Sequence, residues 1–137
     1  MTVCLDAYGL LAWVQDEPQA DEIEAMLARA ETDAGARCIM SAVNVGEVYC
    51  RVARTRGDGA ADSLWDDARA GRLPVSLVAV TVPRARAAAR LKAHHAIACA
   101  DAFAIATALE HGVPLVTGDP EIRAVHETLG LELLWLD

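Results

Sequence analysis

The sequence predicts an α/β fold in which a central five-stranded parallel sheet is covered by helices on both faces, as a three-layer sandwich. Five short apolar runs alternate with longer segments whose apolar residues recur at helical spacing. The short runs are apolar almost without interruption, which is typical of parallel strands buried on both faces. A length of 137 residues is most simply one domain, 1–137, and suffices to bury a core without disulfides or metals.

The first half of the chain supplies two strands and four helices. Pro18 suits the first turn of a helix, and Gly35 ends it. A later helix carries valines at 45, 48 and 52, the spacing of one helical face. The predicted elements are strand 2–5, helix 7–14, helix 18–31, strand 37–41, helix 43–56 and helix 60–70.

The second half continues the alternation. Pro83 and Pro120 each suit a first helical turn, and Gly112 ends the apolar helix between them. The predicted elements are strand 75–80, helix 83–95, helix 96–112, strand 114–117, helix 120–130 and strand 131–136.

Composition limits the function classes. The net charge of −8 disfavours non-specific binding of nucleic acid, so a nucleic-acid function requires a local basic patch and a cation. An acidic chain also suits a basic protein partner. The four cysteines, which lack a C-x-x-C pair, are expected to be reduced, buried thiols rather than zinc ligands. We expect a soluble, cytoplasmic protein, since no secretory signal and no apolar run of about 20 residues is present.

Four carboxylates follow the strands or begin the next helix. Asp6 follows the first strand, Asp119 follows the fourth, Glu47 lies in the helix after the second, and Asp101 lies near the start of the helix before the fourth. Ligands in such folds bind beyond the carboxyl ends of the strands, where strand order reverses. We therefore expect these four carboxylates to converge on one edge of the sheet.

Each carboxylate also has a purely structural interpretation. Asp6, Asp101 and Asp119 can cap the helices that follow them, and Glu47 can be a solvated residue paired with Arg51. Capping is the weaker explanation for Asp101, because the helix after it is apolar nearly all round and an ionised carboxylate there is costly unless it is satisfied. Clustered carboxylates raise one another's pKa, and a bound Mg²⁺ or Mn²⁺ removes that penalty.

Several blocks of the sequence, in this order and spacing, resemble a PIN domain, and the chain is similar to the VapC-type ribonuclease toxins of toxin–antitoxin pairs. The blocks are VCLDAYGLLAWV, SAVNVGEVYCRVAR, CADAFAIATALEHGVPLVTGDPEIR and LELLWLD. The resemblance covers essentially the whole chain. It departs from the family at Tyr8, where the family often has Ser, Thr or Asn, and at the sequence TGD, a mild variant of TND.

The resemblance implies a PIN-like fold and a metal-dependent endoribonuclease. It assigns catalysis and Mg²⁺ or Mn²⁺ binding to Asp6, Glu47, Asp101 and Asp119, with Thr117 as a supporting hydroxyl. A metal-activated water would attack the RNA phosphodiester, with no need for a histidine base. Further implications are a homodimer and a small antitoxin partner, for which segments 7–30 and 43–70 are a candidate groove.

RNA contacts are expected from Arg51, Arg54, Arg84 and Arg86, although an ordinary solvated face fits these residues equally well. No aromatic platform for base stacking is recognised. A receiver module, which also has five strands and acidic residues, needs a lysine after its fifth strand, and the only lysine here is Lys92. A catalytically silent PIN module that acts as a protein-binding partner remains the alternative.

Overall fold

The computed structural model describes residues 1–137 and contains one five-stranded sheet in which every pairing is parallel. The strand order is β3-β2-β1-β4-β5, so β1 lies at the centre. The predicted α/β class with a five-stranded parallel sheet is confirmed. The strands are β1 (Val3–Leu5), β2 (Cys38–Ser41), β3 (Val75–Val78), β4 (Leu115–Thr117) and β5 (Leu133–Trp135).

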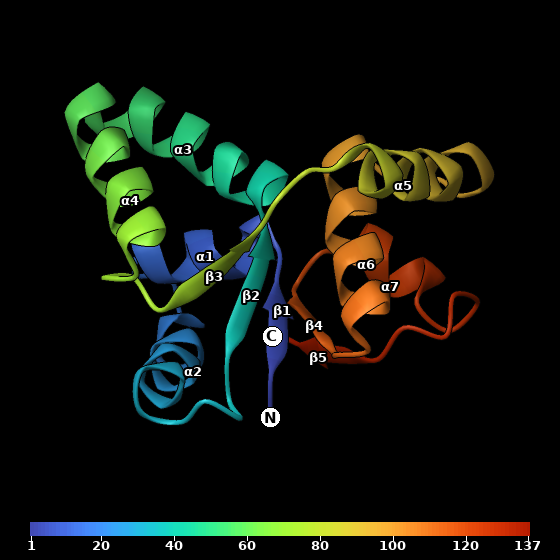
Figure 1. Ribbon diagram of the computed structural model, residues 1–137, viewed down its shortest axis with the longest axis horizontal. Helices are drawn as coiled ribbons and strands as arrows, with labels where there is room; N and C mark the ends of the chain where they lie inside the picture. The colour runs from blue at the N-terminus through green and yellow to red at the C-terminus, as the bar shows by residue number, and fades with distance from the viewer.

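Helices cover both faces of the sheet (Figure 1). The first four helices lie on one side of the sheet, and the last three lie on the other side. The helices are α1 (Ala7–Val14), α2 (Ala20–Thr32), α3 (Ala42–Arg56), α4 (Asp58–Ala70), α5 (Val82–His94), α6 (Cys99–His111) and α7 (Pro120–Val125). None of them is long and apolar enough to span a membrane.

Successive side chains of each central strand enter opposite layers of the core. In β1, Val3 and Leu5 pack into the layer of α1 to α4, whereas Cys4 packs into the layer of α5 to α7. In β4, Leu115 and Val116 divide between the two layers in the same way. This alternation explains why the strands read as unbroken apolar runs, since neither face meets water.

The sheet has its switch point between β1 and β4. From β1 the chain builds outward through β2 and β3, and then returns to the other side of β1 with β4 and β5. The connections after β1 and β4 consequently leave the sheet in opposite directions and open a crevice at the carboxyl ends of these strands. Residues that follow β1 and β4 therefore border the same crevice.

Most predicted boundaries differ from those observed, and three of the differences concern the ends of β3 and α7 and the start of α6. Strand β3 ends at Val78, not at residue 80, because its only partner β2 ends at Ser41, which is paired with Val78. Helix α7 ends at Val125, before turns that lead to Gly130 at a φ of 67°. Helix α6 begins at Cys99, so that Asp101 falls inside its first turn.

The prediction that all four cysteines are buried is wrong for two of them. All four are free thiols, and Cys4 and Cys38 are buried. Cys50 and Cys99 are exposed, because each lies on a helix face directed away from the sheet while its apolar neighbours face the core. Apolar neighbours in the sequence do not show which face of a helix a cysteine occupies.

Candidate metal centre

Asp6 joins the centre of the sheet to the first helix. It follows β1 directly, is the N-cap of α1, and is 2% exposed. Its Oδ1 accepts a hydrogen bond of 2.9 Å from the backbone N–H of Gly9, and its Oδ2 accepts one from the hydroxyl of Thr117. The predicted cap is therefore present, but it uses only one of the two oxygens, and the other points toward β4.

Thr117 connects the ends of the two central strands. It is the last residue of β4 and is fully buried. Its hydroxyl donates to Asp6 and accepts the backbone N–H of Asp119 at 3.0 Å. Asp119 in turn caps α7, since its Oδ1 accepts the N–H of Glu121 at 2.8 Å and Pro120 occupies the first helical position. A single hydroxyl thus fixes the positions of two carboxylates.

Asp101 does not cap its helix, and the capping interpretation is wrong for this residue. It is the third residue of α6, whose N-cap is Ala98, and no side chain caps this helix. A carboxylate in the first turn is stabilised by the positive end of the helix dipole, but Asp101 is only partly exposed and accepts no hydrogen bond from the backbone N–H groups of its helix. Its side chain instead lies beside Asp119.

Glu47 is held in place by Asn44, a residue that was not predicted to belong to the site. Asn44, in the first turn of α3, is 1% exposed. Its Nδ2 donates to Glu47 Oε1 and to the backbone carbonyl oxygen of Ala100, both at 3.0 Å. Asn44 therefore ties Glu47 to the residue that precedes Asp101. The expected ion pair between Glu47 and Arg51 does not form.

The four predicted carboxylates share one electrostatic environment. Burial raises the pKa of Asp6 to about 7, opposed by the hydrogen bonds from Thr117 and Gly9 and reinforced by repulsion from Asp119 and Glu47. Burial, followed by repulsion from Asp119, also raises the pKa of Asp101, and Asp6 and Glu47 add to the effect. The structure therefore brings Asp6, Glu47, Asp101 and Asp119 together at the crevice beside β1 and β4.

The carboxylate of Glu121 lies in the same group. We call the five carboxylates of Asp6, Glu47, Asp101, Asp119 and Glu121 the acidic cluster. Oxygens of Asp101, Asp119 and Glu121 lie within 4.8 Å of one another. Glu121 was not predicted, because an acidic residue in a first helical turn is common without any ligand. Hard divalent cations take carboxylate oxygens at such spacing, and the buried Asn44 Oδ1, which has no hydrogen-bond partner, is a further oxygen nearby. The donor set therefore fits Mg²⁺ or Mn²⁺.

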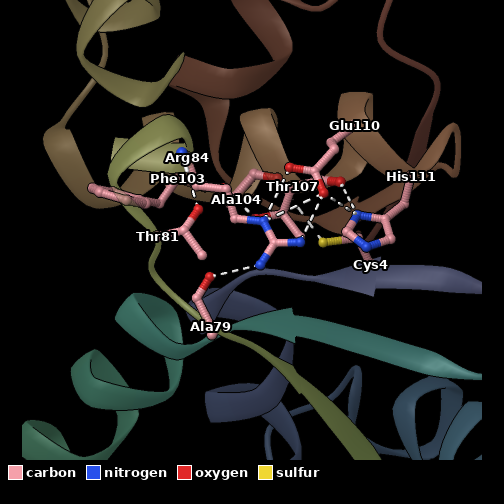
Figure 2. A network of polar contacts seen from close by, with 9 residues as sticks. All are labelled: Cys4, Ala79, Thr81, Arg84, Phe103, Ala104, Thr107, Glu110 and His111. Atoms are coloured by element: carbon pink, nitrogen blue, oxygen red, sulfur yellow. Dashed lines mark hydrogen bonds and ion pairs between the residues drawn. The ribbon is translucent and has the colours of Figure 1, made fainter. Parts of the chain in front are cut away.

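The arginines expected to bind RNA occupy different environments. Arg51 and Arg54 are exposed on α3 beyond Glu47, and Arg86 is exposed on α5. Arg84 is already engaged, as Figure 2 shows: its Nε and Nη2 donate to Glu110 at 3.0 and 2.9 Å, and its Nη1 donates to the carbonyl oxygen of Ala79 at 3.0 Å. It lines a cavity of about 440 Å³ that includes none of the acidic cluster.

No histidine side chain forms a hydrogen bond to the acidic cluster. His111, the last residue of α6, lies 2.9 Å from the carbonyl oxygen of Thr107 through its Nδ1, beside Glu110 (Figure 2). His126 contacts the carbonyl oxygen of Leu131. The prediction that Gly112 ends this helix is confirmed, with Gly112 at a φ of 62° directly after His111.

The chain matches a known family and known folds. A model of the PIN-domain family matches residues 3–127. Among solved structures, VapBC2 from Rickettsia felis bound to a promoter DNA fragment aligns over 100% of both chains at 14% identity and a TM-score of 0.71. VapC20 from Mycobacterium tuberculosis, a sarcin–ricin loop cleaving toxin, aligns over 90% of this chain and 94% of its own at 16% identity and a TM-score of 0.71.

A third structure has the same architecture. FitAcB from Neisseria gonorrhoeae aligns over 96% of each chain at 20% identity and a TM-score of 0.64. No curated protein is significantly similar in sequence. At these identities the structural matches establish the fold, and they agree with the family match over nearly the whole chain.

Proposed function

Because the chain belongs to the PIN-domain family, we propose that it is a metal-dependent endoribonuclease that acts as the toxin of a type II toxin–antitoxin pair. The observation that carries the proposal is the acidic cluster at the switch point of the sheet. Five carboxylates from four separate segments gather at one crevice, which the helix caps formed by Asp6 and Asp119 do not explain, and their mutual repulsion destabilises the metal-free protein.

We assign the metal-ligating role to Asp6, Asp101, Asp119 and Glu47, and we add Glu121. When bound, Mg²⁺ or Mn²⁺ supplies Lewis-acid polarisation of the scissile phosphate and a water of lowered pKa. Asp101, Asp119 and Glu121 offer the most closely spaced oxygens. Thr117 and Gly9 fix the orientation of the Asp6 carboxylate, and Asn44 fixes that of Glu47.

RNA as the substrate is supported by the similarity to a toxin that cleaves the sarcin–ricin loop. The proposed partners are a second copy of this chain and a small antitoxin; a toxin–antitoxin complex of similar fold from Klebsiella pneumoniae supports the antitoxin. A net charge of −8 suits an antitoxin that presents a basic residue to the acidic cluster.

The test is cleavage of single-stranded RNA by the purified chain with Mg²⁺ or Mn²⁺, with EDTA, and after Asp101→Asn. Removing a ligand should cost more than the roughly 10- to 100-fold lost when a group supporting a ligand is removed. Asp66→Asn, an exposed carboxylate on α4, is the matched control and should cleave normally.

Cleavage that continues in EDTA, or that is unaffected by Asp101→Asn, contradicts the metal-dependent mechanism. Specific binding of an antitoxin without any RNA cleavage would favour the silent module. Growth arrest on expression of the chain, relieved by co-expression of its antitoxin, tests the toxin role separately.

A further inference from the structure

Tyr8 is packed against a glycine beside the acidic cluster. It lies two residues after Asp6 in α1, and its ring contacts Gly118, which directly precedes Asp119. A Cβ at residue 118 would lie 2.4 Å from Tyr8 Cε1 and 2.6 Å from Cζ, far closer than atoms can approach. Glycine at 118 is therefore what allows the tyrosine ring to occupy this place, and the two departures from the family pattern are parts of one contact.

The ring is also unusually exposed. Tyr8 is 42% exposed and is the only aromatic among the exposed large hydrophobic residues. Its hydroxyl forms no hydrogen bond, whereas the other tyrosine, Tyr49, donates to Asp62 and packs edge-on against Trp65. Neither core packing nor hydrogen bonding explains the position of Tyr8.

Tyr8 and Arg51 line one pocket of about 360 Å³ between α1, the segment after it and α3. In sequence, Tyr8 is two residues from Asp6 and Arg51 is one helical turn from Glu47, although no residue of the acidic cluster itself lines this pocket. Gln15 and Glu17 also line this pocket and present polar groups to it.

These groups match the chemistry of a nucleotide. An exposed aromatic ring stacks on any base, and a guanidinium binds the adjoining phosphate. The amide of Gln15 and the carboxylate of Glu17 are partners for base edges, the carboxylate for an exocyclic amino group. The contact of Tyr8 with Gly118, which directly precedes Asp119, places a base stacked on the ring beside the acidic cluster.

We infer that Tyr8 and Arg51 form a nucleotide subsite in which the base beside the scissile phosphate of single-stranded RNA stacks on the Tyr8 ring. The inference rests on the proposed ribonuclease function and names a residue for substrate positioning within it. It also changes the interpretation of the sequence, in which no stacking platform was recognised, because the platform is a single tyrosine that becomes visible only beside Gly118.

The experiment measures binding of fluorescein-labelled single-stranded RNA dodecamers of mixed sequence, by fluorescence anisotropy in Mg²⁺. All proteins carry Asp101→Asn so that the RNA stays intact. Tyr8→Ala should weaken binding about 5- to 150-fold, the range expected for loss of one base stack. Tyr8→Phe should retain most of the affinity because it keeps the ring, and Tyr49→Phe is the matched control.

A second comparison isolates the stacked base. Once the cleavage position is mapped with the unsubstituted chain, an abasic nucleotide beside it should weaken binding when Tyr8 is present and have no further effect in Tyr8→Ala. Gly118→Ala, which displaces the ring, should behave in the same way: it weakens binding in the Tyr8 protein and adds nothing to Tyr8→Ala.

Three results would overturn the subsite. Unchanged RNA affinity of a folded Tyr8→Ala protein removes it while the ribonuclease proposal stands. Loss of antitoxin binding alone, with RNA affinity unchanged, assigns the pocket to the protein partner. If the chain carrying aspartate at 101 neither cleaves RNA nor binds it in Mg²⁺ or Mn²⁺, both the subsite and the proposed function fail.

Discussion

Replacing Asp6 by asparagine should stabilise the metal-free protein at pH 8 but destabilise it by about 1 kcal/mol at pH 4, where the folded protein holds Asp6 protonated and the weakened contact with Thr117 is not offset. The folded state raises the pKa of Asp6 from 3.8 to about 7, which corresponds to about 4 kcal/mol at roughly 1.4 kcal/mol per pKa unit. The folded protein therefore binds more protons than the unfolded chain between these values, so its stability falls as pH rises from about 4 to 7.

The asparagine removes the buried charge and keeps an oxygen for the Gly9 N–H, but it weakens the contact with Thr117, at a cost of about 1–2 kcal/mol. The expected net gain at pH 8 in EDTA is about 2–3 kcal/mol, or roughly 8–12 °C in Tm for a chain of this size. Asp66→Asn, whose carboxylate is exposed, should stay within about 0.5 kcal/mol of the unsubstituted chain.

The assay is thermal denaturation followed by circular dichroism, in EDTA at pH 4 and pH 8 and again with Mn²⁺. Mn²⁺ should raise the Tm of the unsubstituted chain more than that of Asp6→Asn, because a ligand stabilises only the state that binds it. A variant that is destabilised at pH 8, or that differs equally from the unsubstituted chain at both pH values, would refute the reasoning.

Three further outcomes are expected. Thr117→Val leaves the N–H of Asp119 unpaired and should lower the free energy of unfolding, measured by chemical denaturation, by about 1–3 kcal/mol. It should also lower Mn²⁺ affinity, measured by calorimetry, roughly 10- to 100-fold. Unaltered Mn²⁺ affinity would contradict the role of Thr117 as a bridge between Asp6 and Asp119. Asn44→Ala removes the hydrogen bonds to Glu47 and to the carbonyl oxygen of Ala100. It should lower the free energy of unfolding by about 1–3 kcal/mol and the rate of RNA cleavage roughly 10- to 100-fold. Full activity would show that Glu47 needs no such support. Arg51→Ala should reduce the slope of log RNA affinity against log salt concentration by about 0.7. Arg84→Ala should leave this slope unchanged, because the guanidinium of Arg84 is bound to Glu110. An equal reduction of the slope in both variants would show that Arg84 also contacts RNA phosphates.

The residues that could be predicted are those whose role follows from local sequence. Asp6 directly follows β1, and Asp119 follows the end of β4 after one glycine. Because parallel strands bring their carboxyl ends to one edge of the sheet, the strand pattern alone brings both residues to the crevice. Asp101 was conspicuous because it is a charge at the start of an apolar helix. The family resemblance then supplied Glu47, which has no local signal of its own.

The residues that escaped prediction depend on contacts between distant segments. Asn44 contacts Ala100, which is 56 residues away, and the ion pair that occupies Arg84 reaches 26 residues along the chain to Glu110. Tyr8 meets Gly118 across the switch point of the sheet. Helical periodicity and strand alternation describe which face of an element is buried, but they do not state which side chain of another element lies opposite.

The hydrogen bond from Thr117 to Asp6 spans 111 residues, and this has a consequence for the protein during its synthesis. A nascent chain on the ribosome can pair β1 with β2 and β3, but β1 lacks its second neighbour until residues 115–117 have emerged. Asp119 reaches the centre of the molecule with that last docking step. The acidic cluster is therefore incomplete for most of the chain's synthesis, and it is assembled only when the chain is almost complete.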